Sequence, residues 1–143
     1  DATSDSTVGN TDGVTVYYEH ETGVNQVKAG TASAIAANIQ TGDFDLDHKG
    51  LDGDGEFIMK IRRVLPDFLS QTGNAIVTLN LKNYPSDSQA SSSLGPFTAT
   101  TSTTKIDTRA RGRAVALKIS NDSTGQHWKL GTFRLDIQPD GRR

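Results

Sequence analysis

A short acidic segment holds the residues whose type and spacing come closest to a metal site. Three aspartates alternate along it, and two more flank a glycine a few residues later: Asp43, Asp45, Asp47, Asp52 and Asp54. Clustered carboxylate oxygens are the ligands that calcium prefers, but an EF-hand loop needs glycine at its sixth position, where this segment has His48. We therefore exclude an EF-hand. Two interpretations stay open, a calcium site of another kind or an acidic strand edge that discourages association between sheets.

Residues for acid–base or nucleophilic catalysis do not form a recognisable set. The three histidines, His20, His48 and His127, show no metal-ligand spacing, and no serine lies in a Gly-x-Ser-x-Gly turn. His20 stands between Glu19 and Glu21, but in a strand its side chain would point away from both. The chain has no cysteine, which excludes thiolate chemistry and disulfides. We predict a protein that is not an enzyme, has no catalytic residues and needs no cofactor.

Three arginines at alternate positions form the clearest cluster of positive charge. Arg109, Arg111 and Arg113 would project from one face of a strand, as a ladder of phosphate contacts would. The same parity continues into the apolar positions that begin at Val115, so an undisturbed strand would run from a basic face into the core. A β-bulge at Gly112 would remove this conflict by inserting one residue. It would bury Ile106 with Val115 and leave Arg109 with Ala116 outside.

Charge is distributed unevenly, although its net value is only −2. Residues 1–60 carry 3 basic and 11 acidic side chains, residues 61–100 carry 3 and 2, and residues 101–143 carry 9 and 4. An acidic front and a basic tail can complement each other between subunits. We therefore expect two sets of residues at or near subunit interfaces, in contact with each other rather than with DNA: the arginines Arg109, Arg111 and Arg113, and the aspartates Asp43, Asp45 and Asp47.

The elements that would position these residues are β-strands, because apolar and polar residues alternate with period two in several segments. The clearest segments are 56–64, 75–83, 114–120 and 128–138, and those with strand composition are 14–18, 97–102 and 104–109. Segment 31–39 fits a strand or one helical turn. Turns are expected at 71–74 and 121–126, the second leading into a C-terminal hairpin, and a Ser-rich loop at 84–96.

Seven or eight short strands predict an all-β chain that folds as an antiparallel β-sandwich or jelly roll with long polar loops. Residues 1–13 are interpreted as a linker and residues 14–143 as the sandwich domain. The chain begins with Asp1 and its only methionine is Met59, so we expect it to be part of a longer protein. No apolar run approaches the ~20 residues that a membrane-spanning helix needs.

The strand periodicity also predicts the hydrophobic core. The residues expected to be buried are Phe57, Met59, Ile61, Val77, Leu79, Leu81, Val115, Leu117, Ile119, Trp128, Phe133, Leu135 and Ile137.

Several segments together resemble virion proteins of short-tailed bacteriophages, of the tail-hub, nozzle or packaged-DNA-stabilising type. They are YEHETGVN at 18–25, IQTGDFDL at 39–46, DGEFIMKIRRVLPDF at 54–68, GPFTATTSTTKIDTRARGRAVALKIS at 95–120 and WKLGTFRLDIQPDGRR at 128–143. They cover more than half of the chain in the expected order. The chain differs from the family in the segment DHKGL at 47–51 and in the length of its Ser-rich loop.

The resemblance implies a structural protein of the phage tail, in the ring or tube below the portal, that helps to retain and conduct the packaged DNA. It implies a homo-oligomer, commonly a sixfold ring, with other tail or portal-adaptor proteins as partners and DNA that passes without sequence-specific contact. The alternatives are a receptor- or carbohydrate-binding β-sandwich and a capsid decoration protein. A carbohydrate platform needs exposed aromatic residues, and most of the nine aromatic residues here occupy core positions of the predicted strands.

Overall fold

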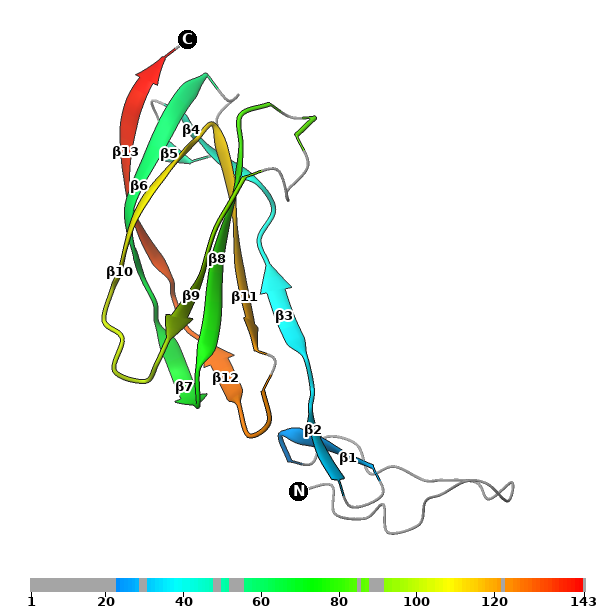
Figure 1. The fold of residues 1–143 in the computed structure, drawn as a ribbon. Helices are drawn as coiled ribbons and strands as arrows, with labels where there is room; N and C mark the ends of the chain where they lie inside the picture. The colour runs from blue at the N-terminus through cyan, green and yellow to red at the C-terminus, as the bar shows by residue number, and fades with distance from the viewer. Residues whose placement is uncertain are drawn as a thin grey trace.

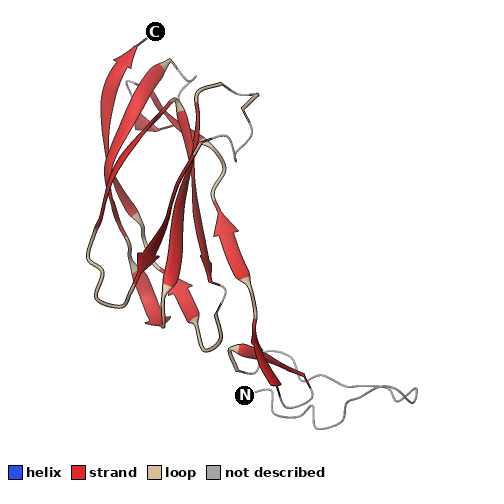
Figure 2. Ribbon diagram, in the orientation of Figure 1, coloured by secondary structure: helices blue, strands red, loops and turns tan. Residues whose placement is uncertain are grey.

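The structure, a computed structural model, describes residues 23–28, 31–47, 50–51, 56–84, 86–87, 92–121 and 123–142. These residues form thirteen strands and no helix (Figure 2). The prediction of an all-β chain is confirmed. The predicted linker 1–13 and the predicted strand 14–18 lie outside the described residues.

The larger sheet contains six strands, all paired antiparallel. Their order is β5–β4–β11–β8–β9, and β3 pairs with the end of β11 that β4 does not reach. The strands are β3 (Ala37–Gln40), β4 (Phe44–Asp47), β5 (Gly50–Leu51), β8 (Ala75–Lys82), β9 (Ser93–Ala99) and β11 (Ala114–Asn121). The two central strands, β8 and β11, are those that periodicity predicted over 75–83 and 114–120.

The smaller sheet faces the larger one and consists of β10 (Ile106–Gly112), β6 (Phe57–Leu65) and β13 (Arg134–Arg142), in that order. Figure 1 shows β10, β6 and β13 on one side of the molecule and β8, β9 and β11 on the other. All pairs in both sheets are antiparallel. This arrangement is consistent with the predicted β-sandwich.

Two short strands prolong the pair formed by β6 and β13 beyond an interruption. β7 (Phe68–Thr72) follows β6 directly, and β12 (His127–Leu130), which pairs with it, precedes β13. Between the two ladders the backbone amide of Gly131 donates to the carbonyl oxygen of Asp67 at 2.9 Å, and the amide of Thr132 donates to Oδ2 of Asp67 at 3.1 Å. The predicted single strand over 128–138 and its hairpin with the preceding strand are therefore wrong, because these residues pair with β7 and β6.

The core lies between the two sheets and contains most of the residues predicted for it. Eight of them are buried: Met59, Ile61, Val77, Leu79, Leu81, Val115, Leu117 and Ile119. The other five are half-buried: Phe57, Trp128, Phe133, Leu135 and Ile137. The half-buried residues belong to β6, β12 and β13 or to the link between the last two, so burial is less complete in this layer than in the larger sheet.

A β-bulge in β6 adds a core residue that period two alone does not predict. Ile61 pairs with Ile137 and Arg63 pairs with Asp136, so Arg62 has no partner residue on β13. Because of the extra residue, Ile61 and Val64 are both fully buried, although their spacing of three residues would place them on opposite faces of a regular strand.

The predicted bulge at Gly112 is wrong, because the chain changes sheets there. β10 ends at Gly112 and pairs with β6, whereas β11 starts at Ala114 and pairs with β8. At this corner the amide of Arg113 donates to the carbonyl of Lys82 at 2.9 Å. Ile106 and Val115 are buried and Arg109 is exposed, as expected.

Ala116 was expected outside but is fully buried. It pairs with Asn80 on β8, which is also buried. The Nδ2 atom of Asn80 donates to Oε1 of Gln40 at 3.3 Å, so a polar contact from the end of β3 reaches this position. Ala116 therefore lies beneath a polar contact rather than in solvent.

The region 93–112 shifts relative to the predicted strands because a turn lies within it. Thr103 donates its amide to the carbonyl of Thr100 at 3.1 Å, and Oγ1 of Thr103 accepts from the amide of Thr100 at 2.9 Å. This local pairing ends β9 at Ala99, before the predicted limit of 102, and delays β10 until Ile106. β9 also takes up residues 93–96, so the predicted Ser-rich loop at 84–96 extends too far.

The N-terminal part of the described chain forms an arm, defined here as residues 23–28 and 31–40. β1 (Asn25–Lys28) and β2 (Thr31–Ala34) pair with each other, and β3 follows. Of the two interpretations of segment 31–39, the strand is correct. Figure 1 shows β1 and β2 beyond the end of β11, away from the two facing sheets.

Candidate interaction surfaces

The structure describes only part of the acidic segment, and in this part Asp43 already forms an ion pair. Oδ2 of Asp43 lies 2.5 Å from Nζ of Lys82. Asp45 is half-buried on β4, where it pairs with Ala114. The side chain of Asp47 and both Asp52 and Asp54 lie outside the described residues. Within the described part of the chain, no three acidic or histidine side chains come together in a group that could hold a metal ion.

We expect millimolar calcium to leave the melting temperature of this protein unchanged. Lys82 already compensates Asp43, so a calcium ion would have to compete with the lysine for this carboxylate. Differential scanning calorimetry with and without calcium, and with magnesium as the control, measures the effect. A ligand at one hundred times its dissociation constant stabilises a protein by about 2.7 kcal/mol. A calcium-specific rise that disappears in Asp45→Ala would contradict the expectation and establish a site in this segment.

The histidines considered for chemistry do not meet in the described structure. His127 is exposed on β12. His20 and His48 lie outside the described residues, as do Glu19 and Glu21.

The three arginines singled out from the sequence have different surroundings. Arg109 and Arg111 both lie at exposed positions of β10, where the burial alternates strictly. Nε of Arg111 lies 2.5 Å from Oδ2 of Asp140 on β13, and its NH2 group donates to the carbonyl of Asp140 at 3.3 Å. Arg113 lies at the corner where the chain passes from β10 of the smaller sheet to β11 of the larger sheet. The three arginines therefore do not form a ladder of equivalent side chains, which was the alternative to a bulge at Gly112.

A different cationic group forms on the outer face of the smaller sheet, where β6 and β10 lie side by side. Lys60 and Arg62 are exposed on β6, and Arg109 is exposed on β10. Lys60 is the register partner of Arg111, and Arg109 lies in the irregular stretch opposite Arg62. We call Lys60, Arg62 and Arg109 the basic cluster. The sequence analysis did not single out Lys60 or Arg62.

The smaller sheet as a whole is cationic. Strands β6, β10 and β13 carry seven lysines and arginines and three aspartates. The six strands of the larger sheet carry two lysines and two aspartates. Among the described strands, the excess positive charge therefore lies on the smaller sheet, whereas the charges of the larger sheet balance.

Around the basic cluster, ion pairs cross the strands of the sheet. Arg63 lies between Asp136 of β13 and Asp107 of β10, with Nε at 3.4 Å and 4.0 Å from their carboxylates. Lys105 also binds Asp107, at 2.9 Å. The hydrogen bond from Lys105, with the charges of Lys105 and Arg63, lowers the pKa of Asp107 below its ordinary value. Asp107 therefore stays ionised and compensates Arg63 at neutral pH.

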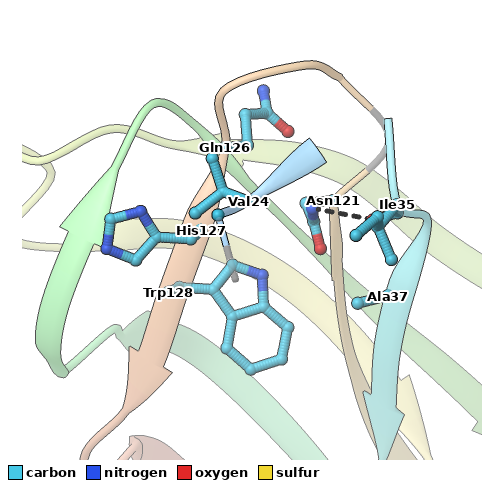
Figure 3. A pocket seen from close by; sticks show the side chains of 8 residues that line it. Val24, Ile35, Ala37, Asn121, Gln126, His127 and Trp128 are labelled. Carbon is cyan, nitrogen blue, oxygen red and sulfur yellow. Dashed lines mark hydrogen bonds between the residues drawn. The ribbon is translucent and has the colours of Figure 1, made fainter. Parts of the chain in front are cut away.

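An apolar groove of about 240 Å³ lies where the arm meets the sandwich. It is lined by Val24, Ile35 and Ala37 from the arm and by Asn121 and Trp128, among others, from the sandwich. Figure 3 shows the indole of Trp128 between β12 and the segment that carries Ile35 and Ala37. The Nε1 atom of Trp128 is buried and has no hydrogen-bond acceptor among the described residues.

Two hydrogen bonds connect the arm to the loop after β11 and to the end of β11. Oδ1 of Asn25 accepts from the amide of Gly125 at 2.6 Å, and Nδ2 of Asn121 donates to the carbonyl of Ile35 at 3.3 Å (Figure 3). The aliphatic side chains of the arm remain exposed, with Ile35 at 49% and Ile39 at 47% of their full accessibility. The arm is thus joined to the sandwich by polar contacts and by the β3–β11 ladder, while Val24, Ile35 and Ile39 remain exposed.

Comparison with models of known protein families finds no match, and comparison with curated proteins finds no similar protein. The described residues include no helix of the length and apolar character needed to cross a membrane. The class that the structure defines is an all-β sandwich with a projecting arm.

Proposed function

We propose that this chain is a non-enzymatic structural protein of a short-tailed bacteriophage, and that it assembles with copies of itself and with neighbouring tail proteins in the ring or tube below the portal. The resemblance of five sequence segments supports the virion and the tail as its location. The all-β sandwich is compatible with such a role. In this role the packaged DNA passes the protein without sequence-specific contact.

The observation that carries the assembly role is the exposed aliphatic surface of the arm. Ile39 pairs with Ile119, so it continues a row of side chains that is buried in the sandwich, yet it is 47% exposed. Ile35 and Val24 extend this surface towards the groove at Trp128. Contiguous exposed apolar surface marks protein–protein contacts. A neighbouring subunit would cover these side chains.

The rival role as a carbohydrate-binding module finds less support. Among the described residues, Tyr84 is the exposed aromatic side chain, at 67% of its full accessibility. Phe68, Trp128 and Phe133 pack against one another at the end of the sandwich. A stacking platform for sugar rings usually needs more than one exposed aromatic ring on the same face.

The experiment measures the oligomeric state of the protein by native mass spectrometry and electron microscopy. We expect the unchanged chain to form closed oligomers and the double variant Ile35→Ser/Ile39→Ser to be monomeric, because the variant loses the apolar surface that subunits would bury. The control is Leu69→Ser, which changes a leucine that is 68% exposed on β7, outside the arm. A monomeric unchanged chain, or oligomers that survive the double substitution, would contradict the proposed assembly.

A further inference from the structure

The basic cluster is a group of like charges that no carboxylate of the described residues compensates. No ion pair or hydrogen bond joins Lys60, Arg62 or Arg109 to another described residue. Like charges on adjacent strands destabilise an antiparallel sheet. Three other arginines of this sheet have a partner: Arg63 binds Asp136 and Asp107, Arg111 binds Asp140, and Arg142 binds Glu56. Arg134, exposed at the start of β13, is likewise joined to no other described residue, so the uncompensated charge of this sheet lies at these three positions and at Arg134.

The described carboxylates of a second copy offer little to neutralise the cluster. Five already bind a lysine or arginine of their own chain: Asp43, Glu56, Asp107, Asp136 and Asp140.

Two further carboxylates accept backbone amides. Asp67 accepts from Thr132, and Asp87 accepts from Asn83 and Tyr84. Among the carboxylates whose side chains the structure describes, Asp45 is left without a hydrogen bond or ion pair. Three uncompensated cations that lie side by side on one face suit a partner that carries dense negative charge of its own.

We propose that the outer face of β10–β6–β13 binds the phosphate backbone of double-stranded DNA through Lys60, Arg62 and Arg109. The three side chains are long and exposed on the outer face of a sheet, a geometry suited to backbone phosphates rather than to base edges in a groove. Contacts of this kind are independent of sequence and allow a protein to slide along DNA. This inference rests on the proposed function, because it names the surface that the packaged DNA would contact. It assigns Arg109 to DNA, whereas the sequence analysis places Arg109 against carboxylates of a neighbouring subunit.

The test compares the binding of random-sequence duplex DNA by the full chain and by two double variants over a salt series, using fluorescence anisotropy. Arg62→Glu/Arg109→Glu reverses two charges of the basic cluster. Lys118→Glu/Lys129→Glu makes the same change in net charge on the larger sheet and on β12. Each phosphate contact contributes about 0.9 to the slope of log K against log salt. We expect the cluster variant to lower this slope by about 1.8 and the control to change it much less.

Oligomeric state and melting temperature are measured on the same variants. Equal loss of DNA binding in both variants would mean that net charge alone attracts DNA, and the proposal would fail. Loss of oligomers with unchanged DNA binding in Arg62→Glu/Arg109→Glu would show that the cluster contacts another subunit, which would also overturn it. Since the arm variant Ile35→Ser/Ile39→Ser leaves the cluster intact, its effect on assembly tests the proposed function separately.

Discussion

Replacing Leu79 by alanine should lower the free energy of unfolding by about 2 to 5 kcal/mol. Leu79 is fully buried at the centre of β8, where it pairs with Leu117 of β11 and Leu94 of β9. Alanine removes the buried methyl groups and leaves a cavity between two sheets that can collapse only partly. Urea denaturation followed by circular dichroism measures the loss, which should appear as a lower midpoint with an unchanged slope.

The matched control is Leu69→Ala, because this leucine lies on β7 with 68% of its surface exposed. Its replacement should change the free energy of unfolding by no more than about 0.5 kcal/mol. A loss below about 1 kcal/mol for Leu79→Ala would mean that the inner and outer faces of β8 have been assigned the wrong way round.

Replacing Gly131 by alanine should destabilise the protein by about 1 to 3 kcal/mol. A β-carbon at this position would lie 2.9 Å from the carbonyl oxygen of Asp67 and 3.0 Å from its Oδ2 atom. The amide of Gly131 donates to that carbonyl, so the two backbones cannot separate without losing the contact that joins the two ladders. The loss should therefore combine steric strain with a weakened hydrogen bond, and thermal unfolding measures it.

Gly42→Ala is the control for this substitution. A β-carbon at Gly42 would have no heavy atom within 4 Å. Alanine there should leave stability unchanged or raise it by up to about 1 kcal/mol, because it restricts the unfolded chain. Equal effects of the two substitutions would show that the approach of Gly131 to Asp67 is not required by the fold.

The sequence predicts the strands that lie between two partners and whose inner faces are fully covered. In β8 and β11 every second residue faces the opposite sheet, so period two identifies both strands and their inner side chains, but not the burial of Asn80 and Ala116 on the other face. In β6 the same rule fails after Ile61, because the bulge at Arg62 shifts the parity and buries Val64. Local sequence does not contain this information, since a bulge is defined against the partner strand.

The interruption between the β6–β13 and β7–β12 ladders could not be predicted from the sequence either. Pro66 correctly predicts the end of β6, since proline cannot donate a hydrogen bond, but nothing local indicates that pairing resumes at Phe68 with a strand some sixty residues later. Asp67 makes the resumption possible by accepting from both Gly131 and Thr132.

The candidate surfaces depend even more on tertiary structure. The arginines Arg109, Arg111 and Arg113 alternate in the sequence, yet their surroundings differ in the fold. Arg111 binds Asp140, and Arg113 lies beyond the end of β10 at Gly112. The basic cluster joins Arg109 to Lys60 and Arg62, which are distant in the chain. Only the pairing of β10 with β6 brings these three residues side by side. A count of charges along the chain therefore cannot identify the residues of the cluster.

The arm and the final strand leave the sandwich at opposite ends: β1 and β2 lie beyond the lower end in Figure 1, and β13 runs out at the upper end. Tension applied between these two ends would therefore act along the strands rather than across them. Under such a load the β6–β13 ladder would be sheared, so that its backbone hydrogen bonds resist together instead of opening one after another. The ion pairs of Arg63 with Asp136, Arg111 with Asp140 and Arg142 with Glu56 would share that load as ties between β13 and the rest of its face.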